Sequence, residues 1–340
     1  MSVKWRVLGS FVLLYTLCVV SSPAQVPQPN ATSDEAIAQA LQQIAGLTSK
    51  GLAAERTGDR RQAISYLNQA LALARKVGHR PSEARALYNL GSTYLLINEH
   101  ETALTLLQQA LDLSREIEAR TDEALILSAL GNLYKSTGQR ERALDLYRQA
   151  LTVHRQEGDS QGEAVTLNRM AVLLNEAGEN EQALVLYGQV LALARGRDNK
   201  EATATALNNI GAVYYGLRNY PRAASHFREA LEIYRSTGGA EGEANTLNSL
   251  GAVSFEAGDD KQALTYYQQA LRLQRAILDR RGEAVALHNI ARVYARTGDK
   301  RRAIQSFREA AAIYERIGDR ERAAREHAHI KQMVTRSKRH

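Results

Sequence analysis

The stretch LSALGNLYKSTGQRERALDLYRQA (residues 127–150) decides the fold, because its pattern returns every 40 residues along the chain. Alanine stands at position 143 of this stretch, and the same residue recurs without an insertion at 63, 103, 183, 223, 263 and 303. Self-similarity at a fixed period of this length is typical of an array of repeated structural units. We therefore expect the 340 residues to form one elongated array rather than two globular domains.

Within one period, apolar residues recur at helical spacing in two groups, as at 127–134 and 143–150. Gly138 lies between the groups, seven residues after a small residue, and suits a left-handed residue that ends the first helix. Polar residues such as Asp59 and Asp259 then have the spacing of N-caps for the second helix. Each period therefore predicts a helical hairpin.

Small residues repeat where the two helices of a hairpin are expected to touch. In every period a Gly or Ala follows a leucine by four residues, and a leucine or an aromatic residue follows the repeated alanine by four. Small residues let helix backbones approach, whereas a bulky side chain would wedge the hairpin open. We therefore assign the aromatic residues of this pattern to the core; they are Tyr147, Tyr187, Phe227, Tyr267 and Phe307.

The motif Leu-x-x-Leu-Gly-x-x-Tyr at 87–94 and 127–134, followed by Ala-x-x-x-aromatic at 143–147 and 223–227, resembles the tetratricopeptide repeat. The resemblance implies an all-α fold, a right-handed α-solenoid of seven helix-turn-helix hairpins with a C-terminal capping helix. The long period is similar to that of kinesin light chain, of Pins-type adaptors and of bacterial arrays that precede a caspase-like protease domain. We expect the residues beyond the usual period of about 34 to lengthen the second helix and its exit.

The sequence predicts four parts. Residues 1–24 are expected to be a signal peptide, 25–33 a flexible linker, 34–323 the array, and 324–340 a capping helix with a basic tail. The seven repeats are expected at about 44–83, 84–123, 124–163, 164–203, 204–243, 244–283 and 284–323.

The N-terminus has the layout of a secretory signal peptide. Lys4 and Arg6 precede an apolar run at 7–20, and the small residues that follow favour cleavage after Ala24. This run is shorter than the ~20 residues that span a bilayer, so a membrane anchor is the alternative. We expect a secreted or periplasmic protein of bacterial type, whose mature chain has lost Cys18, the one cysteine.

The formal net charge of +7 does not indicate a nucleic-acid site. Lys4 and Arg6 leave with the signal peptide, and four further positive charges lie in the last ten residues, so the array itself is nearly neutral. Such a basic tail is usually solvated, and binding of nucleic acid or an anionic surface through it is the least favoured hypothesis. The sequence has no recognisable catalytic, metal or cofactor motif, so we expect no enzymatic activity and no cofactor.

Polar side chains recur on the first helices at a position that the hairpin contact does not use. This polar stripe reads Thr48, Tyr88, Ser128, Asn168, Asn208, Asn248 and His288, and Asn209 and Asn289 lie beside it. The resemblance implies that the first helices line a concave face. A carboxamide both donates and accepts, so the stripe could bind the backbone of an extended peptide; alternatively, the asparagines bond to neighbouring helices and only tile the array.

One turn further along the first helices, successive repeats carry a second set of side chains, Lys135, Asn175, Tyr215 and Phe255. Tyr215 and Phe255 could anchor an apolar side chain of a partner, or could belong to the packing between repeats. The sequence thus predicts an exported, non-enzymatic scaffold that binds a peptide or helix of another protein, not a small-molecule substrate. The alternative is the sensor or recognition subunit of a split caspase-like protease or signalling system.

Overall fold

The computed structural model describes residues 31–336, so the predicted signal peptide and most of the predicted linker lie outside the described residues. All regular structure in the described part is α-helical. The helices are α1 (Ala31–Arg56), α2 (Arg60–Lys76), α3 (Arg80–Leu96), α4 (His100–Glu116), α5 (Arg120–Ser136), α6 (Arg140–Gln156), α7 (Ser160–Glu176), α8 (Asn180–Gly196), α9 (Lys200–Gly216), α10 (Tyr220–Thr237), α11 (Ala240–Glu256), α12 (Asp260–Ala276), α13 (Arg280–Arg296), α14 (Lys300–Arg316) and α15 (Arg320–Arg336).

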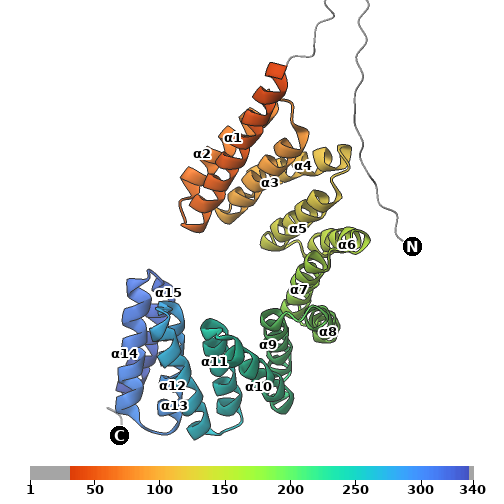
Figure 1. Ribbon diagram of the computed structural model, residues 1–340. Helices are drawn as coiled ribbons and strands as arrows, with labels where there is room; N and C mark the ends of the chain where they lie inside the picture. Colours follow the sequence, from red (N-terminus) through yellow and green to blue (C-terminus); the bar gives the residue numbers. More distant parts are fainter. Residues whose placement is uncertain (1–30, 337–340) are drawn as a thin grey trace, which may run out of the picture.

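Consecutive helices form antiparallel hairpins that stack into an arc (Figure 1). Seven hairpins run from α1/α2 to α13/α14, and α15 packs on α14 as the closing helix. Odd-numbered helices also contact each other across the repeats, as α3 does with α5 and α11 with α13. Helices α3, α5, α7, α9 and α11 lie on the inner side of the arc (Figure 1). The α-solenoid expected from the repeat is confirmed, and its first helices form the concave surface.

The two helices have equal lengths in five of the seven hairpins, the exceptions being α1 with 26 residues and α10 with 18. Every helix from α2 to α9 has 17 residues, and so do α11 to α15. The expectation that the long period would mainly lengthen the second helix is therefore wrong. Helix α1 begins at Ala31, inside the predicted linker 25–33, and α15 begins at Arg320, before the predicted capping helix 324–340.

The linkers explain where helices stop and start. The residues expected to end the first helices, Gly58, Asn98, Gly138, Gly178, Gly258 and Gly298, all have positive φ. The ends of the second helices use the same conformation, for example at Gly318, after which Asp319 accepts from Arg322 N and starts α15. The predicted N-caps are also confirmed: Asp59 accepts from Gln62 N at 3.0 Å, and Asp259 accepts from Gln262 N at 2.9 Å.

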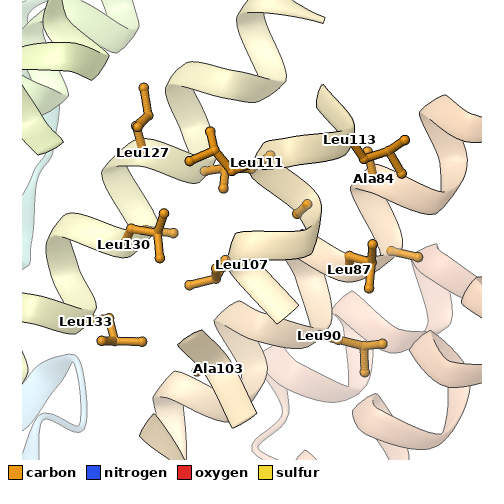
Figure 2. Packing of buried hydrophobic residues seen from close by; sticks show 14 of the residues in the cluster. Ala84, Leu87, Leu90, Ala103, Leu107, Leu111, Leu113, Leu127, Leu130 and Leu133 are labelled. Atoms are coloured by element: carbon orange, nitrogen blue, oxygen red, sulfur yellow. The ribbon is translucent and has the colours of Figure 1, made fainter. Parts of the chain in front are cut away.

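We use the term hairpin seam for the contact between the two helices of one hairpin. The repeated alanines at 63, 103, 143, 183, 223, 263 and 303 are each 0% exposed in this seam. A Cβ added at Gly131 would lie 2.5 Å from the ring of Tyr147. Figure 2 shows the leucines of α3 and α5 on either side of Leu107 and Leu111 of α4, with Ala103 below them on the same helix. The small residues therefore have the packing role that the sequence indicated, and the buried residues form a series of clusters along the array.

Candidate peptide-binding surface

The inner surface carries a series of hollows between successive first helices. One hollow of about 420 Å³ is lined mainly by α3, α5 and α7, and a neighbouring one of about 350 Å³ lies along α7, α8 and α9. Val165 and Arg169 of α7 line both hollows. These two residues therefore stand on the ridge between two recesses of the concave surface.

Apolar side chains are exposed at these hollows. Leu125 on α5 is 41% exposed and Val165 on α7 is 39% exposed. They occupy the same place in successive repeats, where the flanking repeats have Arg85 and Thr205. This local replacement of a polar residue by an apolar one is a signal that the sequence analysis missed.

Arg169 differs from Arg85 and Arg292, which lie on other first helices. Arg85 forms an ion pair with Asp122 at 3.1 Å, and Arg292 forms one with Glu256 at 3.6 Å. Arg169 is half-buried, yet no carboxylate of residues 31–336 forms an ion pair with it. A partly buried cation without a counter-ion favours the binding of an external carboxylate.

The polar stripe mostly bonds to neighbouring repeats. Asn209 Nδ2 donates to Asn168 Oδ1 at 2.9 Å, and Asn208 Nδ2 donates to Thr246 Oγ1 at 2.8 Å. His288 Nδ1 lies 2.9 Å from a carboxylate oxygen of Glu326 on α15. These contacts join consecutive first helices, and they favour the alternative in which the stripe tiles the array.

Two further asparagines of the candidate site lack such bonds. Asn248 Oδ1 is buried and has no hydrogen-bond partner within the described chain, while Asn289 is half-buried. Asn248 and Asn289 hold the places that Asn168 and Asn209 hold two repeats earlier, but they do not form the corresponding bond. The stripe is therefore not chemically uniform along the array.

We call residues 135, 175, 215, 255 and 295 the groove position, because they occupy the same place on successive first helices. Lys135 forms an ion pair with Glu176 at 2.9 Å, and Asn175 is half-buried. Tyr215 is also half-buried, and this burial raises the pKa of its hydroxyl. The four predicted side chains lie on successive first helices in unlike surroundings, and of the four only Phe255 lines one of the described hollows.

Phe255 does not form an open apolar anchor. Its side chain is only 8% exposed, and the guanidinium carbons of Arg296 and Arg292 lie 3.5 and 4.5 Å from its ring centroid. Cations over an aromatic face are attracted by the ring quadrupole. Phe255 therefore belongs largely to the packing between repeats, which was the second reading of this residue.

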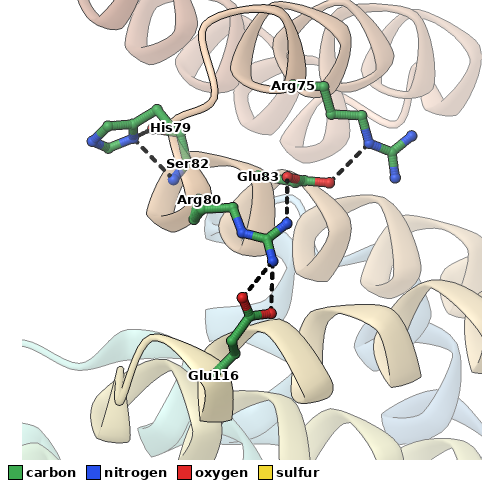
Figure 3. A network of polar contacts seen from close by, with 6 residues as sticks. All are labelled: Arg75, His79, Arg80, Ser82, Glu83 and Glu116. Atoms are coloured by element: carbon green, nitrogen blue, oxygen red, sulfur yellow. Dashed lines mark hydrogen bonds and ion pairs between the residues drawn. The ribbon is translucent and has the colours of Figure 1, made fainter.

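A further feature that the sequence analysis missed is an ion pair between the end of one hairpin and the start of the next. We call it the exit ion pair. Arg75 Nε on α2 lies 2.9 Å from Glu83 Oε1 on α3, and Arg80 links the same carboxylate to Glu116 on α4 (Figure 3). Equivalent pairs join residues 115 and 123, 155 and 163, 235 and 243, and 275 and 283. The sequence signal of this exit ion pair is an Arg followed eight residues later by a Glu, a pattern that recurs at the repeat period.

The carboxylate of the exit ion pair is buried at Glu283. Burial alone would raise the pKa of this carboxyl, but hydrogen bonds from Arg275 and Arg280 outweigh burial, so its pKa is lowered. Glu283 consequently stays ionised and joins α13 to Arg275 of α12. Its role is structural.

Residues 31–336 contain no helix that is both long and apolar enough to cross a bilayer. In the same part of the chain, no group of three or more His, Cys, Asp or Glu side chains is arranged to hold a metal ion.

Comparison with known proteins identifies the repeat. The family model described as tetratricopeptide repeat matches residues 42–116, 100–156, 122–196, 162–236 and 242–316. No curated protein matches the chain.

Solved structures share the fold at low identity. BtubC (BKLC) from P. vanneervenii is 22% identical, covers 70% of this chain and 92% of its own, and has a TM-score of 0.53. A signal-transduction ATPase with a tetratricopeptide repeat sensor from Pyrococcus horikoshii is 14% identical, with coverage of 83% and 44% and a TM-score of 0.69. A Rap protein complexed with Competence and Sporulation Factor is 14% identical, with coverage of 89% and 98% and a TM-score of 0.54. At these identities the likeness shows the fold alone.

Proposed function

The chain belongs to the tetratricopeptide repeat family, a scaffold typical of protein–protein interaction, and on that premise we propose an exported, non-enzymatic protein that binds a peptide segment of a partner on its inner surface. The observation that carries this proposal is Arg169, a half-buried cation on the ridge between two hollows that forms no ion pair with the described part of the chain. Exposed Leu125 and Val165 stand beside it. This combination suits a segment that presents a carboxylate next to apolar side chains.

The chemistry of such binding follows from the surroundings of Arg169. A guanidinium holds a carboxylate through two parallel hydrogen bonds, which orients the bound segment. Apolar side chains of the segment would cover Leu125 and Val165 and remove them from water. Acidic side chains also line these hollows, but two of them already accept hydrogen bonds within the chain. Glu55 accepts from Thr93, and Asp159 accepts from Gly162 N. Glu201 is exposed.

The test compares an inner-surface variant with a matched variant on the second helices. Val165→Ser/Arg169→Gln alters the ridge, whereas Val185→Ser/Arg228→Gln makes the same changes at exposed positions of α8 and α10. Crosslinking and affinity capture from the native compartment should recover one partner with the wild type and the matched variant. The ridge variant should lose that partner. Equal capture by all three proteins would contradict the proposal.

Export is tested separately by sequencing the N-terminus of the protein from its native cells. We expect a mature chain that begins at Gln25, because small residues precede this position after a short apolar run. An intact N-terminus in the membrane fraction would favour the N-terminal membrane anchor instead.

A second candidate function is a sensor or recognition subunit for a signalling enzyme or a caspase-like protease on another chain. The observation that favours it is the fold likeness to the ATPase with a repeat sensor, of which this chain covers 44%. Repeated co-purification with an ATPase or protease subunit would support this function, and a purely non-enzymatic partner would contradict it.

A further inference from the structure

A separate hollow of about 530 Å³ lies at the C-terminal end of the array. Its walls come from α13, α14 and α15, with one residue from α11. The residues that matter here are Phe255, Arg292, Ala295, Lys300, Phe307 and His329. None of them lines the hollows beside Arg169.

The hollow arises because the residue at the groove position of α13 is small. Earlier repeats carry a large side chain there, such as Tyr215 or Phe255, whereas α13 carries Ala295. Ala295 is exposed and lines the hollow, so the volume that an aromatic side chain occupies one repeat earlier is unfilled. The hollow therefore has room for one aromatic side chain supplied from outside.

The walls are apolar at depth. Phe307 and Phe255 are 3% and 8% exposed, and the ring of His329 stacks on Phe307 with centroids 5.1 Å apart. Aromatic pairs of this kind add to the free energy gained by burying their area. An aromatic guest would complete this cluster.

The rim of the hollow is cationic. Lys300 is half-buried and forms no ion pair within the described residues, whereas Arg292 is already paired with Glu256 at 3.6 Å. The acidic Glu326 nearby is buried and bound by His288. A guest that carries a carboxylate next to its aromatic ring would therefore meet a complementary charge.

The chain itself displays this chemistry one repeat earlier. Phe255 lies beneath Arg292 and Arg296, and the next residue, Glu256, forms the ion pair with Arg292. The inner surface thus already holds an aromatic residue followed by an acidic residue, and both belong to the chain itself. At α13 the equivalent pair is Ala295 and Arg296, so neither the ring nor the carboxylate is present.

We propose that the hollow beside Ala295 binds an aromatic side chain of a partner segment, and that Lys300 holds an acidic residue that follows it. The inference rests on the proposed function in one respect, namely that the partner is a peptide segment of another protein. The site itself is separate from the ridge at Arg169.

The experiment selects peptides from a random displayed library on the full chain and on single variants. Ala295→Phe fills the hollow with the side chain found at position 255, and Lys300→Gln removes the unpaired charge. Ala276→Phe, at an exposed position of α12, is the matched control. Selected peptides are then synthesised with a fluorescent label, and their affinities are measured by anisotropy.

We expect the wild type and Ala276→Phe to select peptides with Phe, Tyr or Trp followed by Asp or Glu. Ala295→Phe should bind these peptides at least about tenfold more weakly, because the guest ring has no space. Lys300→Gln should weaken binding about fivefold and abolish the preference for Glu over Gln in otherwise identical peptides. The thermal midpoint of each variant should match that of the wild type, since the altered side chains are not core residues.

Two results would overturn the inference in different ways. Peptides that bind Ala295→Phe as tightly as the wild type, but fail to bind Val165→Ser/Arg169→Gln, would refute the C-terminal site and leave the proposed function standing. A library that yields no binder on any of these proteins would refute both.

Discussion

The hairpin seam and the inner surface are built from the same first helices, yet their residues vary very differently along the chain. At the seam every repeat places an alanine at 0% exposure, and small residues face leucine or aromatic rings. At the groove position the residue changes from lysine to asparagine, tyrosine, phenylalanine and alanine. Each repeat must keep small residues at the seam so that the two helices can pack, whereas residues of the inner surface can change without separating the helices of a hairpin.

The largest expected effect comes from breaking the seam. Gly131→Val would place a side chain 2.5 Å from the ring of Tyr147 before any adjustment, so we expect a loss of about 3 kcal/mol in unfolding free energy. Urea unfolding followed by circular dichroism measures this loss. Gly188→Val is the matched control, because a Cβ at Gly188 meets nothing within 4 Å. Equal stabilities of the two variants would contradict the role given to the seam.

A smaller effect separates tiling from binding within the polar stripe. Asn208→Ala removes the bond to Thr246, whose side chain is fully buried, and should cost about 1 kcal/mol. Thermal unfolding measures this cost, and Asn245→Ala at an exposed position of α11 should cost less. If Asn208→Ala leaves stability unchanged but weakens partner binding, the stripe is a ligand site after all.

The exit ion pair predicts a dependence of stability on pH. The folded pKa of Glu283 is lowered, so its ion pairs stabilise the fold above the unfolded pKa of about 4.3, and this stabilisation is lost as pH falls through the folded pKa. Because Arg275 and Arg280 are about half exposed, the contribution is below about 1 kcal/mol.

Thermal midpoints at pH 6 and pH 3.5 measure this contribution. The midpoint of Glu283→Gln should fall less on acidification than that of the wild type. Glu241→Gln, which changes an exposed residue on α11, should follow the wild type. Identical pH dependence of all three proteins would remove Glu283 as a contributor.

The smallest effect on stability is expected on the ridge. Val165→Ser and Val185→Ser both change exposed valines, and each should alter unfolding free energy by less than about 0.5 kcal/mol. The two variants should differ in partner binding alone. A clear loss of stability in Val165→Ser would show that the ridge is part of the packing rather than a free surface.

The difference between these two regions also explains what the sequence could predict. The repeated alanines and the left-handed linker residues are local signals that recur along the array, the caps at Asp59 and Asp259 are local signals as well, and the structure confirms them. The partners of the inner-surface residues lie in the next repeat, as Thr246 does for Asn208. The repeat period alone does not determine which of two neighbouring residues a carboxamide hydrogen-bonds to, because this depends on side-chain geometry.

Phe255 and Ala295 illustrate the remaining gap. The sequence placed Phe255 on the correct face, but its exposure depends on Arg292 and Arg296 from the following repeat, which cover its ring. The hollow beside Ala295 depends on a side chain that is small where its equivalents are large. Comparing the repeats with one another at each position, rather than reading each repeat alone, would have indicated both features.

The equal helices and short linkers have a consequence for how the length of such an array can change. Because each hairpin with its linkers occupies 40 residues, a block of that size can be duplicated or removed while the flanking helices keep their phase. The number of hairpins is then a quantity that recombination can adjust in whole steps. Each added step lengthens the arc and brings a further set of inner-surface residues that is free to diverge.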